Sequence, residues 1–436
     1  MTAMVARPVG SAELKRNAAA QEAVNKEWDN LRRRGVWKES NVRERADVIA
    51  EAKAAGREVQ FGRVHCICVE KNSELPLGDP KRRYKGRAVF LGNQVVNQDY
   101  QQAMFAELGN APASMEAARL NDWYACLPGH SGGTTDGVQA YCQARLLGVE
   151  CWIALPWTAV IDTETWRVYG DPVTILEYAL YGHVDSPTSW EVHCDAELAA
   201  AGFDRIGAEW PSVYFHHNLR LLLTVYVDDF KLSGPEGHLD AGWKLIAERI
   251  EIEPPTPFGL YLGVRQHMTD MTLPDGSRVR GMEYEMTDFL KQCVQKYREL
   301  ADFQGDFPQV GTPFLSSESE PGPARAPAKA VSGVMPGTVA DEDEGPDEAE
   351  KGELASVAAQ IVMKVLYAAR AVRLDLLRAV QGLARCMTKW TRRSDAELFR
   401  LIAYIDTTVE LRLVGWVGDE MKDIHPHLYS DADFAG

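Results

Sequence analysis

The sequence lacks any segment that would anchor it in a membrane or direct its export. No apolar run approaches the roughly 20 residues needed to span a bilayer. The first residues, MTAMVARPVGSAELKRN, lack the apolar core of a secretory signal. Without an export signal, we expect the eight cysteines to be reduced thiols. These absences predict an intracellular protein of the cytoplasm or nucleus with no membrane partner.

Positive charge is also scarce. The 436 residues include 47 Lys and Arg against 63 Asp and Glu, which gives a formal net charge of −16. Proteins that coat nucleic acids are usually basic, so any nucleic-acid binding here would need a focused cationic groove. Residues 316–352 carry part of the negative charge, are rich in Pro, Ala and Gly, and contain no aromatic residue. They predict a disordered acidic linker.

The most informative stretch is LLLTVYVDDFKLS at residues 221–233. Two apolar runs flank a Tyr-Val-Asp-Asp sequence, which predicts a β-hairpin with Asp228 and Asp229 at its turn. Like charges in contact repel and raise each other's pKa, so folding alone gives no reason for this pair. A divalent cation would offset the repulsion. The alternative is an ordinary solvated Asp-Asp turn.

A second candidate site is a basic hairpin. Residues 61–70 alternate and are rich in β-branched side chains, and residues 83–96 follow as a returning strand after a turn. The hairpin carries five cations, namely Lys81, Arg82, Arg83, Lys85 and Arg87. In an acidic protein this cluster indicates either a binding surface or an edge strand protected by charge.

Periodicity and breakers predict the remaining elements. Helices are expected at residues 23–37, 41–56, 111–127, 173–181, 186–201, 238–250, 288–301, within 354–389, and at 394–407. Further strands are expected at residues 151–156, 166–169, 212–215, 219–225, 260–264, 281–286, 411–417 and 427–429. Residues 129–133 are expected to form a loop.

Asp136 stands upstream of the Asp-Asp hairpin, at the start of an apolar segment. The order strand, helix, strand, hairpin can bring Asp136 beside Asp228 and Asp229 on one face of an antiparallel sheet. Three converging carboxylates would suit two Mg²⁺ or Mn²⁺ ions about 3.5–4 Å apart, which clamp the oxygens of a phosphoryl displacement. Mg²⁺ keeps several waters, so few protein carboxylates suffice. The sequence therefore predicts a two-metal site.

Seven sequence blocks stand in a recognisable order. They are YKGRAV at 84–89 with Gly92, DGVQAY at 136–141, ALYG at 179–182 with Pro187 and Trp190, YVDD at 226–229, LG at 262–263, a set of positions between Tyr367 and Thr407, and SDADFAG at 430–436. Together they resemble the reverse-transcriptase region of a Ty1/copia-type retrotransposon polyprotein, over roughly residues 23–436 apart from the linker. The last block resembles the start of ribonuclease H, of which the rest is missing, so that activity is not expected.

This resemblance implies an α+β fold with right-hand polymerase fingers and palm, an antiparallel palm sheet backed by helices, and a helical connection segment. It implies an RNA-directed DNA polymerase that adds dNTPs to a primer 3′-OH on an RNA or DNA template. The expected regions are a disordered N-terminus at 1–22, fingers at 23–133, palm at 134–265, palm end or connection at 266–315, the linker at 316–352, helical connection at 353–429, and truncated ribonuclease H at 430–436.

The resemblance also implies roles for individual residues. The metals would be held by Asp136, Asp228 and Asp229. The triphosphate of the incoming nucleotide would be contacted by Lys85 and Arg87. The Tyr141 ring would clash with a ribose 2′-OH and so select deoxynucleotides. The nucleotide pocket would be lined by Tyr181 and Gly182.

Three positions depart from the family pattern, which has leucine at His183, glutamine at Asp185 and alanine at Gly86. Asp185 would oppose triphosphate binding if it pointed into the pocket. Two alternatives therefore stay open: an inactive remnant of a retroelement with at most weak nucleic-acid binding, and a metal-free scaffold. The sequence leaves the oligomeric state undetermined.

Overall fold

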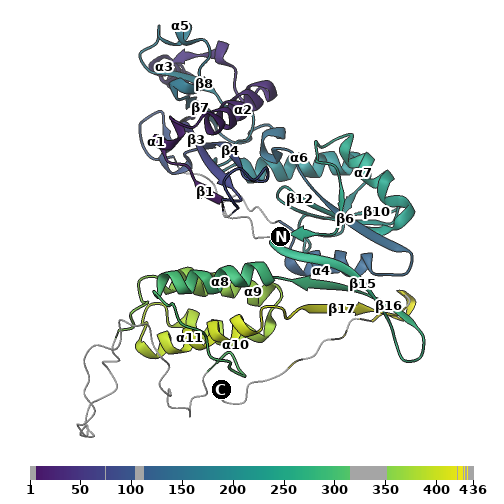
Figure 1. Cartoon of the computed structure of the whole chain (residues 1–436). Helices are drawn as coiled ribbons and strands as arrows, with labels where there is room; N and C mark the ends of the chain where they lie inside the picture. Colours follow the sequence, from purple (N-terminus) through teal and green to yellow (C-terminus); the bar gives the residue numbers. More distant parts are fainter. Residues whose placement is uncertain are drawn as a thin grey trace, which may run out of the picture. The chain divides into compact units, whose positions relative to one another are not determined.

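The computed structural model describes residues 6–73, 75–103, 112–314, 351–419, 421–425, 427 and 430. Most of the predicted acidic linker and of the SDADFAG block lies outside these residues. The chain divides into two compact units, Met4–Pro257 and Phe258–Gly436. Each combines largely antiparallel sheets with helices, a mixed α/β architecture (Figure 1).

The first sheet of Met4–Pro257 follows the order β1-β3-β7-β8-β2, with β4 and β5 also paired to β3. Its strands are β1 Ala6–Pro8, β2 Arg43–Glu44, β3 Val59–Lys71, β4 Arg83–Phe90, β5 Val96–Asn97, β7 Glu150–Ala154 and β8 Pro172–Ile175. The long antiparallel β3–β4 ladder confirms the predicted basic hairpin. Strand β7 pairs with β3 in parallel.

Four helices accompany this sheet: α1 Ser11–Leu14, α2 Ala18–Arg34, α3 Arg45–Ala54 and α5 Thr163–Trp166. Helix α2 starts earlier than predicted because the Asn17 side chain accepts a hydrogen bond from the Ala20 N–H and so caps it. It ends at Gly35, which adopts the left-handed conformation at φ 70°. Its buried residues Trp28 and Leu31 join the core beneath the sheet.

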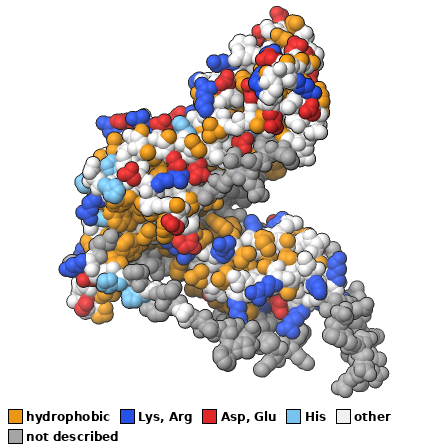
Figure 2. Space-filling model, turned by 180° about the vertical axis from the view of Figure 1, so that it is seen from behind, with side chains coloured by type: hydrophobic (Ala, Val, Ile, Leu, Met, Phe, Trp, Pro, Cys, Tyr) orange, Lys and Arg blue, Asp and Glu red, His pale blue; other side chains and the backbone are white. Residues whose placement is uncertain are grey.

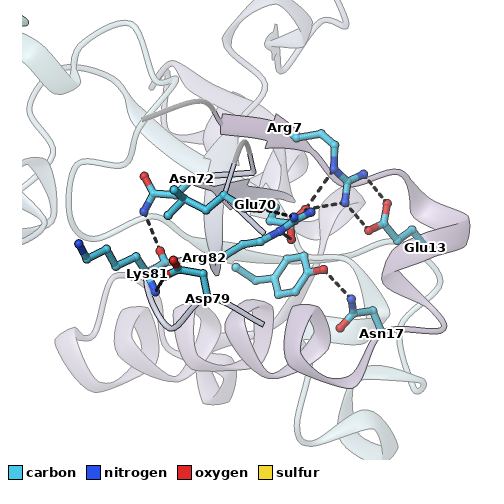
Figure 3. A network of polar contacts seen from close by, with 10 residues as sticks. Arg7, Glu13, Asn17, Glu70, Asn72, Asp79, Lys81 and Arg82 are labelled. Atoms are coloured by element: carbon cyan, nitrogen blue, oxygen red, sulfur yellow. Dashed lines mark hydrogen bonds and ion pairs between the residues drawn. The ribbon is translucent and has the colours of Figure 1, made fainter. Parts of the chain in front are cut away.

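An ion-pair network attaches the N-terminal residues to the β3–β4 hairpin (Figure 3). The Arg7 guanidinium contacts Glu13 at 2.6 Å and Glu70 at 2.8 Å, and Arg82 contacts the same Glu70 carboxylate at 2.5 Å. Asn17 donates to the Tyr84 hydroxyl at 2.8 Å. The prediction that residues 1–22 are disordered is therefore wrong for residues 6–22, because charge pairs between distant segments order them.

Removing the Glu70 carboxylate should loosen this attachment. Only 4% of its side chain is exposed, and its two guanidinium partners hold its pKa near 2. We expect Glu70→Gln to lower the free energy of unfolding by about 1–3 kcal/mol in urea denaturation. The depressed pKa means that wild-type Glu70 contributes stability above its ordinary pKa of 4.5, and that this contribution is lost as the pH falls toward 2. Arg7→Ala is the control, with a smaller effect, since its side chain is 42% exposed.

The second sheet of Met4–Pro257 follows the order β13-β6-β12-β11-β10-β9. Its strands are β6 His130–Asp136, β9 Asp204–Arg205, β10 Val213–His216, β11 Leu221–Tyr226, β12 Asp229–Pro235 and β13 Thr256–Pro257. One face carries Leu223, Phe230 and Leu232 and packs on α6 (Ser186–Ala200) and α7 (Leu239–Ala247). The other face receives α4, Met115–Ala125, which contacts β6, β11 and β12.

Three local predictions are wrong. Of the loop predicted at 129–133, residues 130–133 belong to β6, because pairing with β12 outweighs the low strand propensity of Gly132 and Gly133. Residues 173–175 form β8 rather than a helix, since β2 and β7 pair with it. The strand predicted at 166–169 begins with the end of α5, which is capped by the Asp162 side chain.

The predicted boundary between residues 133 and 134 falls inside β6. Helix α4, which was assigned to the fingers, packs on the second sheet, whereas β7 and β8, which were assigned to the palm, belong to the first. The parallel β3–β7 pairing returns the chain to the first sheet after Asp136. The two regions are therefore interleaved in sequence.

The described residues of Phe258–Gly436 form a sheet in the order β14-β15-β16-β17 and four α-helices. The elements are β14 Leu260–Tyr261, β15 Val264–Thr272, β16 Arg278–Glu285, β17 Leu413–Val417, α8 Thr287–Leu300, α9 Ala358–Ala371, α10 Leu377–Arg385 and α11 Arg392–Thr407. The predicted helices of this region and the strands at 281–286 and 411–417 are confirmed. In the described parts of the chain, no helix combines the length and apolar character needed to cross a bilayer.

Candidate active site

The Asp-Asp hairpin forms as predicted. In the β11–β12 ladder Tyr226 faces Asp229, which leaves Val227 and Asp228 at the turn. Val227 has φ 59°, a strained conformation for a β-branched residue. The turn is held from two sides, because Trp190 Nε1 donates to the Val227 carbonyl at 2.7 Å and the Gly137 N–H donates to the Asp228 carbonyl at 2.6 Å.

Asp136 and Asp229 lie directly opposite each other in the β6–β12 ladder. Residues in such positions have Cβ atoms about 4.5–5.5 Å apart. The pKa of Asp229 is raised to about 7, first by burial and then by the charges of Asp228 and Asp136. The charges of the three predicted carboxylates thus act on one another. Within the described residues, however, no group of three Asp, Glu, His or Cys side chains is arranged so that it could hold a metal ion.

A cavity of about 880 Å³ opens beside these carboxylates. Asp136 and Asp228 line it together with residues of α2, β3 and β4. The lining includes seven cations, namely Lys26, Arg33, Arg34, Lys71, Arg83, Lys85 and Arg87. Figure 2 shows acidic and basic side chains intermixed over the face that it displays, whereas this cavity collects cations on one wall.

Several of the cations that line the cavity repel one another, as the carboxylates do. Burial lowers the pKa of Lys71, and the charges of Arg83 and Arg87 lower it further. Burial also lowers the pKa of Lys85, followed by repulsion from Arg87 and Lys71. The cavity is lined by these cations, by Asp136 and Asp228, and by Glu27, Glu251 and Glu253. Such a lining suits a ligand that carries both anionic groups and divalent cations.

Three of the predicted nucleotide-binding side chains stack together. The rings of Tyr141 and Tyr181 lie 4.8 Å apart between centroids, and the Arg87 guanidinium carbon lies 5.2 Å from the Tyr181 ring. Burial, followed by the charge of Asp228, raises the pKa of both tyrosines, to about 12 for Tyr181. The two phenols therefore stay neutral hydrogen-bond donors over the physiological range, next to the Asp-Asp turn.

The two glycines of the predicted blocks have packing roles. A Cβ on Gly86 would stand 2.7 Å from the Ala23 carbonyl oxygen, so glycine allows α2 to approach β4 closely. Gly182 has φ +92°, and a Cβ there would stand 2.2 Å from the Phe90 carbonyl oxygen. Of the predicted site residues, Gly182, Tyr141 and Asp229 are not among those that line the cavity. Gly182 packs against the end of β4.

Two of the three departures from the family pattern, His183 and Asp185, are not among the residues that line the cavity. Asp185 is 5% exposed and its carboxylate lies against Gly148, so it does not add charge to the lining. His183 is buried, with its ring 4.7 Å from that of Phe90. Neither residue therefore opposes anion binding from inside the cavity.

Sequence reasoning missed a network that holds the turn after Asp136. Gln139 has φ 50°, and its side chain accepts from Arg34 Nε at 2.7 Å and donates to Glu27 at 3.3 Å. Glu27 also accepts from the Ala88 N–H, and Arg34 pairs with Glu251 at 2.7 Å. Helix α2 carries a polar stripe at positions i, i+4 and i+7, formed by Lys26, Asn30 and Arg33. This spacing could have predicted that one face of α2 lines a polar cavity.

Comparisons with known proteins are sparse. No family model matches the sequence, and no curated protein is similar to it. Among solved structures, the chain has a likeness to a structure of the foamy viral protease-reverse transcriptase dRH in complex with ds DNA, at 13% identity and a TM-score of 0.27. The match covers 60% of this chain and 40% of that one.

Proposed function

We propose that this chain is an RNA-directed DNA polymerase of the Ty1/copia type. It would catalyse attack of a primer 3′-OH on the α-phosphate of a dNTP, with release of pyrophosphate. Asp136, Asp228 and Asp229 would hold two Mg²⁺ ions, with Mn²⁺ as a substitute. The bound ions would neutralise charge on the attacking and leaving oxygens.

One observation carries this proposal: Asp136 and Asp228 line the same cavity as the seven cations. Burial and then repulsion from Asp228 and Asp136 raise the pKa of Asp229 to about 7. Burial and then repulsion among the cations lower the pKa of Lys85. A bound triphosphate with its divalent ions would reduce both the repulsion among the carboxylates and the repulsion among the cations. Oxygen ligands from carboxylates are also the ligands that Mg²⁺ prefers.

The chain's own residues would bind and orient the nucleotide. Arg87 and Lys85 would bind the triphosphate, for which a planar guanidinium offers two parallel donors. Arg34 and Glu27 would keep Gln139 in its left-handed conformation and so fix the turn that follows Asp136. Most of the catalysis would come from positioning and charge neutralisation.

Primer extension tests the proposal directly. The full chain is incubated with a primed RNA template, the four dNTPs and Mg²⁺ or Mn²⁺, and products are resolved on a denaturing gel. We expect extension in the presence of either ion and none with EDTA. Absence of product with both ions would contradict the proposal.

A second candidate function is the inactive remnant with weak nucleic-acid binding. One observation favours it: within the described parts of the chain, no ready-made group of three ligand side chains exists. This candidate predicts that a primed template binds the protein equally well with and without divalent ions. Electrophoretic mobility shift with Mg²⁺ and with EDTA separates it from the polymerase.

Tyr141 should govern sugar selection. Its ring packs on Tyr181 beside the Asp-Asp turn, where a rigid ring would clash with a ribose 2′-OH. We expect Tyr141→Val to raise the use of rNTPs relative to dNTPs by at least about 10-fold, the range that steric pocket contacts give. The ratio of kcat/KM for dTTP and UTP measures this. Tyr178→Val, whose ring packs against Arg145 and not against Tyr181, is the matched control and should leave the ratio unchanged.

A further inference from the structure

A fully buried ion pair lies beneath the strand that carries Asp229. Lys231 Nζ stands 2.7 Å from Asp122 Oδ1, and both side chains are 0% exposed. Lys231 belongs to β12 and Asp122 to α4. Side chains alternate along a strand, so Lys231 shares a face with Asp229, whereas Phe230 and Leu232 point into the core on the other side.

The adjacent residue of α4 binds both strands of the Asp-Asp hairpin. Asn121 Nδ2 donates to the Leu222 carbonyl on β11 and to the Lys231 carbonyl on β12, each at 3.0 Å. The Ala113 N–H, next to the Ser114 cap of α4, donates to the Val225 carbonyl at 3.1 Å. Helix α4 is thus attached to this hairpin at several points along its length.

The same helix is attached to β6. The chain passes from α4 to β6 through a short turn in which the His130 N–H donates to the Leu127 carbonyl at 3.0 Å. The His130 ring contacts the Tyr124 carbonyl at 3.0 Å through Nδ1. Helix α4 therefore contacts, by specific bonds, both strands that place Asp136 opposite Asp229.

Strand β6 specifies its own register weakly. Its sequence is HSGGTTD, and Gly132 and Gly133 offer no side chain where they face β12. A slip by one residue is forbidden, because it would turn the core side chains of β12 outward. A slip by two residues keeps every side chain on its proper face, yet it would separate Asp229 from Asp136.

The buried pair penalises that slip. A displaced Lys231 would leave its ammonium and the Asp122 carboxylate unpaired in the core, which is far more costly than losing an apolar contact. Stability alone does not account for the pair, since apolar residues of similar volume often serve as well or better. Fixing a register is the best-attested use of such buried polar groups.

We propose that Asp122, Lys231 and Asn121 are positioning residues that set the β6–β12 register and so bring Asp229 opposite Asp136. This inference deepens the proposed function, because it explains how the acidic site is assembled. It concerns strand pairing, however, and can be tested whether or not the site binds metal.

Engineered cysteine pairs in the full chain report the register. D136C/D229C joins directly opposite residues, and T134C/D229C becomes opposite only after a two-residue slip. A disulfide needs Cβ atoms about 3.5–4.5 Å apart, whereas diagonal neighbours lie about 7–8 Å apart. Each pair is combined with the apolar replacement D122L/K231M, oxidised with diamide, and followed by peptide mass spectrometry.

We expect D122L/K231M to slow D136C/D229C cross-linking at least fivefold and to accelerate T134C/D229C cross-linking. Asn121→Ala, which leaves the ion pair intact, should act in the same direction and keeps the test available if the double variant does not fold. Ile246→Val, a mild core change on the other face, should alter neither rate. Unchanged rates in every folded variant would overturn the proposal.

Mn²⁺ titration of chains with native aspartates separates this inference from the proposed function. We expect D122L/K231M to weaken Mn²⁺ binding about 10-fold or more, the effect typical of groups that support metal ligands. If the wild-type chain binds no Mn²⁺, the polymerase proposal fails, and the cross-linking rates still decide the register. If Mn²⁺ binding is equal in both chains, the positioning role is contradicted.

Discussion

Asp228→Asn is expected to abolish primer extension, with a loss of more than about 100-fold in kcat. The substitution keeps the volume of the side chain and removes its charge at the hairpin turn. Even the hydrogen-bond partners of metal ligands contribute 10–100-fold in other proteins, so a ligand itself should exceed that range. Steady-state extension with Mg²⁺ measures the change, and thermal unfolding checks that the variant stays folded.

The matched control for Asp228→Asn is Asp240→Asn. Asp240 lies in the first turn of α7, away from the cavity lining, and its substitution should leave extension unchanged. Asp136→Asn should reproduce the loss seen at Asp228, because it faces Asp229 across the ladder. Extension by Asp228→Asn at the wild-type rate would contradict the assignment of the acidic site.

The second large effect is a dependence of stability on pH and on divalent ions. The pKa of Asp229 rises from 3.8 to about 7 in the folded chain. Between these values the unfolded chain has released this proton while the folded chain keeps it, so stability falls as the pH rises from about 4 to 7. The full shift corresponds to about 4 kcal/mol. Partial exposure of Asp229 reduces the expected loss to about 1–2 kcal/mol.

Urea denaturation in EDTA at pH 5 and pH 8 measures this loss. Asp229→Asn should remove the contribution of this carboxyl to the difference between the two pH values and be more stable than wild type at pH 8. Asp136→Asn should move the transition to lower pH, because it removes one of the neighbouring charges. Mg²⁺ at 100 times its Kd should stabilise the wild-type chain by about 2.7 kcal/mol. Equal pH dependence in wild type and Asp229→Asn would contradict the account.

Sequence reasoning located the hairpin and the Asp136 strand because both signals are local. The apolar runs on either side of Asp228 predict two strands. A carboxylate at the end of a strand is then expected at the edge of the sheet. The prediction that Asp136 lies beside Asp229 depended on one assumption about topology, namely that the intervening elements return the chain to the same sheet. That assumption agrees with the observed ladder.

The rest of the site depends on contacts between distant segments. Glu27 and Gln139 are 112 residues apart, and neither belongs to a recognisable block. The local sequence of residues 6–22 does not predict stable structure. These residues are ordered by contacts such as the hydrogen bond from Arg7 to Glu70, which is 63 residues away in the sequence. Residues 130–133, the first part of β6, were predicted as a loop because glycines have low strand propensity, which the pairing with β12 overrides. No local pattern carries this information.

The direct test of the central claim is the affinity of the cavity for a nucleotide with and without a divalent ion. Binding of dTTP is measured by isothermal titration calorimetry in EDTA and in Mn²⁺. If the cationic wall and the carboxylates act on one ligand, Mn²⁺ should tighten dTTP binding at least about 10-fold, and Asp228→Asn should remove that gain. Binding of equal strength with and without Mn²⁺ would contradict the claim that the two walls form a single active site.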